Sequence, residues 1–138
     1  MWKRIIFLPC LFLLCSCNTT DNKNEAPPEP ETPLQPVYRR ISAKEAHEIM
    51  KEGKAFILLD VRTEEEYQES RIPGSILIPD FEIISRAESE LPDKNALILV
   101  YCRSGRRSES AANELVAMGY TNVFDFGGII DWPFEIEK

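Results

Sequence analysis

Two continuous apolar segments, residues 55–59 (AFILL) and residues 96–101 (ALILVY), restrict the fold of this chain more than any other feature. Each segment is too short for a buried helix and is typical of a strand that is covered on both faces of a sheet. Segments with the apolar spacing and start signals of helices alternate with such strands along the chain. This alternation predicts an α/β fold, in which a mainly parallel sheet is flanked by helices.

Helix start and stop signals place the other elements. Ser42 with Glu45, and Thr63 with Glu66, have the spacing of capping boxes, in which each side chain bonds the backbone N–H of the other residue. The first helix is expected to end near Gly53, which readily adopts the left-handed conformation found at helix C-termini. The further elements expected are a short acidic helix over 64–69, a strand over 76–78, a helix over 81–91, a helix over 108–118 and a strand over 123–126.

The length and charge of the chain narrow its function. A chain of 138 residues has room for one domain of ordinary size. It carries 16 Lys and Arg against 23 Asp and Glu, a formal net charge of -7, which argues against a nucleic-acid ligand. The partners are therefore expected to be small molecules or proteins.

The N-terminal residues have the layout of a bacterial export signal. Lys3 and Arg4 precede the apolar residues 5–15, a run shorter than the roughly 20 residues that a helix needs to cross a bilayer. Residues 14–17 (LCSC) resemble the lipobox of bacterial lipoproteins, which implies that residues 1–16 are removed and that Cys17 is acylated. The protein is then expected to be extracytoplasmic and attached to a membrane through lipid alone. A plain secretory signal with accidental cysteines is the alternative.

Residues 17–37 are expected to form a tether between this signal and the folded part. After Cys17 they contain five of the ten prolines and no aromatic residue, so they cannot bury enough apolar surface to fold. The folded domain is expected over residues 38–138. Removal of residues 1–16 would take away only two charged residues, both basic, and leave 14 basic against 23 acidic residues, a net charge of -9.

A single thiol follows the second apolar strand. Residues 102–107 (CRSGRR) connect that strand to the helix expected from residue 108. Backbone N–H groups of such a loop and of the helix N-terminus can point at the sulfur of Cys102, and three arginines add positive charge. Both effects lower a thiol pKa, so Cys102 is predicted to be a nucleophilic thiolate at neutral pH.

No histidine base is expected beside this thiol. The single histidine, His47, is predicted on the surface of the first helix, and neither a metal site nor a cofactor is predicted. The residues alone leave two alternatives: Cys102 could be an inert core cysteine, or the basic loop could bind an anion without chemistry. Three adjacent cations at a turn favour a reactive thiol.

Three segments of the chain resemble the single-domain rhodaneses. They are residues 102–108 (CRSGRRS) with an Ala-rich helix that ends in Gly119-Tyr120, a stretch from Asp60-Val61-Arg62 to residues 72–75 (IPGS), and residues 123–132 (VFDFGGIIDW). Together they cover nearly all of residues 38–138 in the order and spacing of the family. Arg71 stands where the family usually has His, a departure that concerns local packing or the choice of acceptor rather than the nucleophile.

The resemblance implies a rhodanese domain, a three-layer α/β sandwich, that transfers sulfur. Cys102 would attack the outer sulfur of thiosulfate or a persulfide donor, expel sulfite in the first case, and hold the sulfur as a persulfide. Cyanide or a thiol, a thioredoxin-like protein being one candidate, would then remove the sulfur. The residues expected to bind the substrate are Arg103, Ser104, Gly105, Arg106 and Arg107, with Arg103 and Arg107 as the direct contacts. The residues expected to support the site are Asp60, Arg62 and Ser108.

Three other functions remain as alternatives. Cys-dependent phosphatases and arsenate reductases have a longer loop with Arg six positions after the cysteine, where this chain has Ser108. A rhodanese module without activity would bind a protein partner, but such members typically lack the cysteine that Cys102 provides. A thiol redox protein would need a second thiol, and acylation would block Cys17. Trp132 is expected to be a packing residue.

Overall fold

The computed structural model describes residues 37–138 of the 138-residue chain. The predictions for residues 1–36, which concern the signal peptide, the acylation of Cys17 and the tether, lie outside the described residues. Between residues 37 and 138, no helix has the length and apolar character needed to span a membrane.

Five strands form one sheet, and every strand pair in it is parallel. In their order across the sheet the strands are β1 (Arg39–Arg40), β5 (Val123–Gly128), β4 (Ile98–Cys102), β2 (Ile57–Asp60) and β3 (Ile76–Leu77). The central strand β4 is buried along its whole length. The predicted α/β fold with a mainly parallel sheet is confirmed.

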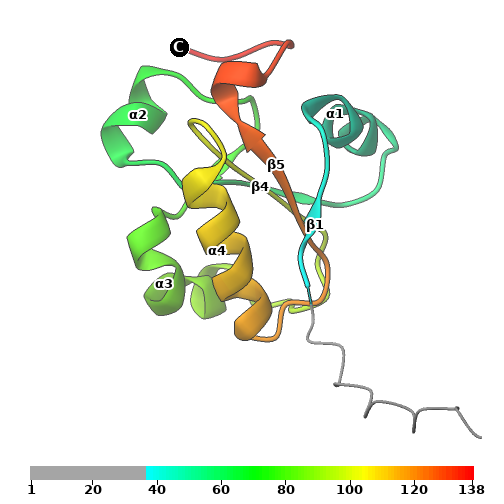
Figure 1. Cartoon of the computed structure of the whole chain (residues 1–138), viewed down its shortest axis with the longest axis vertical. Coiled ribbons are helices and arrows are strands. Elements are labelled where there is room, and N and C mark those ends of the chain that lie inside the picture. Colours follow the sequence, from blue (N-terminus) through cyan, green and yellow to red (C-terminus); the bar gives the residue numbers. More distant parts are fainter. Residues whose placement is uncertain (1–36) are drawn as a thin grey trace, which may run out of the picture. The chain divides into compact units, whose positions relative to one another are not determined.

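Helices cover both faces of this sheet (Figure 1). They are α1 (Ala43–Lys51), α2 (Glu64–Glu69), α3 (Ile83–Glu90) and α4 (Arg106–Ala117), with two short 3-10 turns, η1 (Asp80–Glu82) and η2 (Ile129–Asp131). One face of the sheet packs against α3 and α4, which lie side by side in Figure 1, and the other face packs against α1. The three layers of the expected sandwich are therefore present.

The side chains of β4 explain why an apolar run without alternation forms a strand here. Ile98, Val100 and Cys102 face the core on the side of α3 and α4, whereas Leu99 and Tyr101 face the core on the side of α1. A strand between two helical layers needs an apolar side chain at every position. Burial of one such side chain stabilises a fold by about 1.5–3 kcal/mol, so the end of β4 is firmly fixed.

The helix boundaries largely follow the sequence signals. Both capping boxes are confirmed, with reciprocal side-chain and backbone hydrogen bonds at Ser42 and at Thr63. Helix α2 has the predicted bounds, but α4 begins at Arg106, two residues before its predicted start. The short edge strand β1 was not predicted, because two residues carry no periodic pattern.

His47 is less exposed than its position in the sequence suggested. Its ring stacks on Phe134 with ring centroids 3.7 Å apart, and its Nδ1 atom is buried without a hydrogen-bond partner among residues 37–138. The residues after β5 fold over α1 and place Trp132 in the core on the side of α1. His47 lies on the first helix as predicted, but its side chain is only 29% exposed because it packs on Phe134. The packing role of Trp132 is confirmed.

Candidate active site

Cys102 is the last residue of β4 and is 1% exposed. The chain then turns at Gly105, whose φ of 103° lies in the left-handed region, and α4 begins at the next residue. The backbone conformation is what favours glycine here, since a Cβ atom would meet at 2.9 Å only the flexible end of Arg40. The N–H of Gly105 donates to Sγ of Cys102 at an N–S distance of 3.1 Å. The turn therefore directs a backbone donor at the sulfur.

Opposing effects act on the pKa of Cys102. Burial is the largest single effect and raises the pKa. The N–H and the hydroxyl of Ser108 and the N–H groups of Gly105 and Ser104 lower the pKa, and together they outweigh burial, so the net shift is downward. The direction agrees with the thiolate predicted from the sequence. Hydrogen-bond donors at the start of α4, rather than guanidinium groups, are the largest lowering causes.

The three arginines of this segment have different surroundings. Arg106 and Arg107 belong to the first turn of α4, so the predicted loop of residues 102–107 was too long and the connection ends at Gly105. Arg103 and Arg106 are exposed, and within residues 37–138 neither has an ion-pair partner. These two cations are the ones available to a ligand.

Arg107 is held by an acidic residue of α2. Its Nη1 and Nη2 atoms donate to the two carboxylate oxygens of Glu66, each at 2.8 Å. The hydrogen bonds from Arg107 lower the pKa of Glu66 to about 2, and the same pair raises the pKa of Arg107. Arg107 was predicted to contact substrate directly, but both terminal nitrogens of its guanidinium already bond a carboxylate. The sequence indicated Glu66 only as a capping residue.

A buried network lies behind the turn. Oγ of Ser108 is 2.7 Å from Oδ1 of Asp125, and Asp125 also accepts the N–H of Gly127 at 2.9 Å and Nη1 of Arg40 at 2.8 Å. Asp125 is fully buried in β5, whereas the side chain of Arg40 is about half exposed. The network joins β1, β5 and α4 around the predicted support residue Ser108. An acidic residue inside an apolar strand was the available signal for Asp125, but no local signal marked Arg40.

Asp60 and Arg62 form a buried pair where β2 ends. Nε and Nη2 of Arg62 donate to the carboxylate of Asp60 at 2.7–3.0 Å, and Nη2 also donates to the carbonyl of Ser70 at 2.6 Å. The pair thus ties the end of β2 to the end of α2. Both residues lie at the same edge of the sheet as Cys102, because parallel strands end together there, and this agrees with their predicted supporting role.

Arg71, the departure from the family pattern, fixes the end of the chain. Nε of Arg71 is 3.0 Å from a carboxylate oxygen of Glu137, and their backbones exchange two hydrogen bonds of 3.0 and 2.8 Å. The guanidinium also lies over the ring of Tyr67, 5.0 Å from its centroid. These contacts give Arg71 a packing role beside the site.

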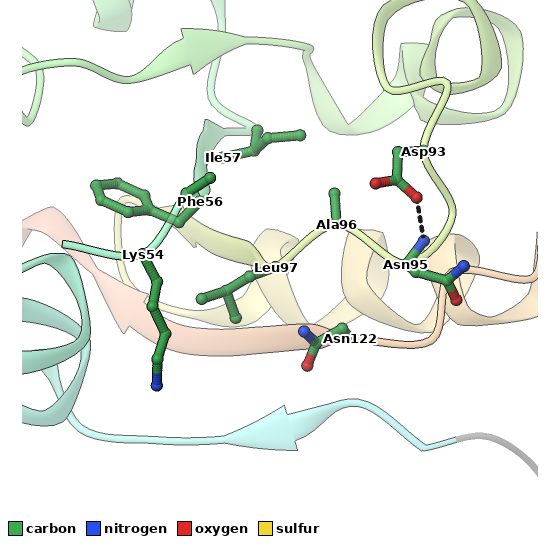
Figure 2. A pocket seen from close by; sticks show the side chains of 9 residues that line it. Lys54, Phe56, Ile57, Asp93, Asn95, Ala96, Leu97 and Asn122 are labelled. Atoms are coloured by element: carbon green, nitrogen blue, oxygen red, sulfur yellow. Dashed lines mark hydrogen bonds between the residues drawn. The ribbon is translucent and has the colours of Figure 1, made fainter. Parts of the chain in front are cut away.

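Two cavities lie at opposite edges of the sheet. One, of about 430 Å³, is at the amino ends of β2 and β4, where Figure 2 shows Lys54, Asp93 and Asn122 among its side chains. It contains no thiol. The other, a groove of about 320 Å³, is at the carboxyl ends, and Arg62 and Arg103 are among its lining residues. The carboxyl edge is where ligands of open α/β sheets bind, so the second groove belongs with the site.

The fold and the site define a class, an α/β domain built around one buried thiol of lowered pKa at a turn from strand to helix. The model of the rhodanese-like domain family matches residues 42–133, and the chain therefore belongs to the rhodanese family.

The similar proteins support this family assignment. Over 73 residues the chain is 44% identical to thiosulfate sulfurtransferase PspE of Escherichia coli, a match that covers 53% of this chain and 70% of PspE. It is 36% identical over 106 residues to adenylyltransferase and sulfurtransferase UBA4 of Candida albicans, with 72% of this chain but only 24% of UBA4 covered. The chain thus spans about a quarter of UBA4. A solved structure described as a rhodanese with anions from E. coli has a TM-score of 0.58 and 40% identity, and covers 61% of this chain and 99% of its own.

Proposed function

We propose that this protein is a rhodanese-type sulfurtransferase that moves a sulfane sulfur from thiosulfate or a persulfide donor to a thiol or cyanide. The observation that carries the proposal is the thiol of Cys102, which ends a buried strand, accepts the N–H of Gly105 and has a lowered pKa. The names of the relatives, which include a thiosulfate sulfurtransferase, support the same chemistry.

In the first half of the reaction the thiolate of Cys102 attacks the outer sulfur of thiosulfate. A bond forms between Sγ and that sulfur, the bond from that sulfur to the sulfonate breaks, and its electron pair leaves with sulfite. The enzyme is left with a persulfide anion. Arg103 and Arg106 attract the anionic donor, because no carboxylate among residues 37–138 pairs with them.

In the second half an acceptor thiolate or cyanide attacks the outer sulfur of the persulfide. The sulfur–sulfur bond to Cys102 breaks, and its electron pair returns to Sγ as the thiolate. The N–H groups that point at Sγ stabilise the thiolate at the start and at the end of this cycle. A thioredoxin-like protein is one candidate acceptor.

A mass measurement tests the proposal directly. A protein in which Cys10, Cys15 and Cys17 are replaced by Ser retains Cys102 as its single thiol. After incubation with thiosulfate it should gain about 32 Da, one sulfur atom held as a persulfide. The further replacement Cys102→Ser should abolish the gain. A protein that gains no sulfur from thiosulfate or from a persulfide donor is not a sulfurtransferase of this kind.

The location of the enzyme is also a proposal. The lipobox-like residues 14–17 support acylation of Cys17 and attachment to the extracytoplasmic side of a bacterial membrane. Labelled palmitate should enter the wild-type protein in a bacterial host, and Cys17→Ser should abolish both the label and the recovery of the protein with membranes. Label in the Cys17→Ser variant would contradict this attachment point.

A further inference from the structure

The groove at the carboxyl edge of the sheet is built from the segment after β2, from α2 and its C-terminal end, from the turn after β4 and from η2. Its lining residues are Arg62, Glu66, Glu69, Ser70, Arg103, Ile129 and Ile130. Arg103 directly follows Cys102, and its carbonyl accepts the N–H of Ile130 at 3.3 Å. The wall formed by η2 is thus joined to the turn that holds the thiol. Cys102 itself does not line the groove, but Arg103, the next residue in the chain, does.

The floor of the groove contains a buried guanidinium with unused donors. The side chain of Arg62 is 4% exposed, and its Nε and Nη2 atoms bond Asp60 and Ser70. Its Nη1 atom has no hydrogen-bond partner among residues 37–138. Asp60 balances the charge of Arg62. The two N–H groups of the Nη1 atom are therefore suited to a carbonyl or carboxylate oxygen that binds in the groove.

The rim of the groove carries one free charge of each sign. Arg103 from the turn and Glu69 from α2 are both exposed, and neither has an ion-pair partner among the described residues. Glu66, the other acidic lining residue, is held by Arg107. Ile130 adds an apolar surface that is 62% exposed. A fitting ligand therefore has a carboxylate, an ammonium group and a short aliphatic part.

We propose that this groove binds the sulfur acceptor, and that the acceptor is a small thiol of the amino-acid or short-peptide class. Its carboxylate pairs with Arg103 and the Nη1 donors of Arg62, and its ammonium group pairs with Glu69. A groove of about 320 Å³ accommodates a molecule of that size. The inference rests on the proposed function, because it assigns the acceptor of the second half-reaction.

The transfer is balanced without an added oxidant or reductant. The acceptor thiol loses its proton to water, and its thiolate attacks the outer sulfur of the Cys102 persulfide. A new sulfur–sulfur bond forms on the acceptor while the bond to Sγ breaks, and the electron pair of the broken bond stays on Cys102. The acceptor leaves as a persulfide, and Cys102 returns to the thiolate.

The experiment measures how fast four thiols discharge the persulfide. The full chain with Cys102 as its single thiol is loaded with thiosulfate, freed of excess donor and mixed with cysteine, cysteamine, 3-mercaptopropionate or 2-mercaptoethanol. The loss of the added sulfur mass is followed with time. The rate for each thiol is divided by the rate for 2-mercaptoethanol with the same protein, and the ratios are compared between variants, so that the intrinsic reactivity of each thiol cancels.

Glu69→Gln is expected to lower the ratios for cysteine and cysteamine about two- to fivefold, the size of one exposed ion pair, and to leave the ratio for 3-mercaptopropionate unchanged. Glu65→Gln is the matched control, since it removes the same charge from an exposed position of α2 that does not line the groove. Equal ratios in the wild-type protein and Glu69→Gln would overturn the inference. So would a persulfide that resists all four thiols but is discharged by thioredoxin. Failure of the wild-type protein to load sulfur would instead contradict the proposed function.

Discussion

Ser108 provides a direct test of how the site stabilises its thiolate. The Ser108 hydroxyl has one proton, and its Oγ lies 2.7 Å from Oδ1 of Asp125 and 3.0 and 3.2 Å from the carbonyl oxygens of Gly105 and Gly127. The same hydroxyl lowers the pKa of Cys102. Ser108→Ala removes this donor and leaves the backbone N–H groups of the turn in place. The pKa of Cys102 is expected to rise, because burial then opposes the thiolate with one donor fewer.

The size of the rise follows from the energy of one hydrogen bond. A hydrogen bond to a charged group contributes about 1.5–3 kcal/mol, and one pKa unit corresponds to about 1.4 kcal/mol. Because Asp125 and the carbonyls of Gly105 and Gly127 compete for the single proton of Ser108, the lower end is an upper bound, and the expected rise is at most about one unit. Persulfide formation at neutral pH should then slow by up to about tenfold, since the attack requires the thiolate.

The same shift has a consequence for stability. The pKa of Cys102 in the folded protein is lower than its ordinary value of 9.0, so the folded state favours the thiolate. The resulting stability is complete above pH 9.0 and is lost as the pH falls through the lowered pKa. Ser108→Ala should therefore reduce the gain in unfolding free energy at high pH.

The assay is an ultraviolet titration of the thiolate in a protein with Cys102 as its single thiol. Ser110→Ala is the control, because it makes the same chemical change at an exposed position of the same helix. The control should titrate like its parent. An unchanged pKa of Cys102 in folded Ser108→Ala would refute the role assigned to the hydroxyl.

Three further substitutions test the supports of the site. Glu66→Gln removes the partner of Arg107 and should cost at most about 3 kcal/mol of unfolding free energy at pH 7. The pKa of Glu66 is lowered from 4.5 to about 2, so urea denaturation should show this difference disappear as the pH falls through that range. Asp125→Asn should lower the unfolding free energy by about 2 kcal/mol, measured by urea denaturation, and slow sulfur loading, because it weakens two buried hydrogen bonds and a third that is partly exposed. Gly128→Ala places a Cβ atom 2.1 Å from the carbonyl oxygen of Arg103 and should cost about 1–3 kcal/mol in thermal unfolding, with slower loading as the turn shifts.

The sequence predicted those parts of the fold that depend on neighbouring residues. The apolar run of β4 required burial on both faces, and a central strand of a parallel sheet is the arrangement that supplies it. The bounds of α2 followed from the distance between Thr63 and Glu66, because the capping box fixes a helix start through local hydrogen bonds. The position of Cys102 at the carboxyl edge followed from the same strand assignment.

The supports of the site could not be predicted because their partners are distant in the chain. Arg40 and Asp125 are 85 positions apart, and Glu66 and Arg107 are 41 apart. Glu66 caps α2 through the N–H of Thr63 at 3.1 Å and binds Arg107 through the same carboxylate. A local pattern revealed the first role and concealed the second, so Arg107 looked free to contact substrate.

The sequence had indicated that one basic loop both stabilises the thiolate and attracts the anionic donor. The long-range pairs show that different groups contribute to these two effects. The guanidinium groups of Arg40, Arg62 and Arg107 each bond a carboxylate, so they brace the carboxyl edge of the sheet. Among these three, Arg107 also interacts with the charge of Cys102. The largest causes that lower the pKa of Cys102 are instead the N–H and O–H donors of the turn and of the start of α4, and the N–H of Gly105 donates directly to Sγ. Arg103 and Arg106 keep their charge, and in a chain of net charge -7 they provide the local attraction that an anionic donor needs. The lowered pKa of the thiol therefore depends mainly on Ser104, Gly105 and Ser108, whereas the attraction of the donor depends on Arg103 and Arg106.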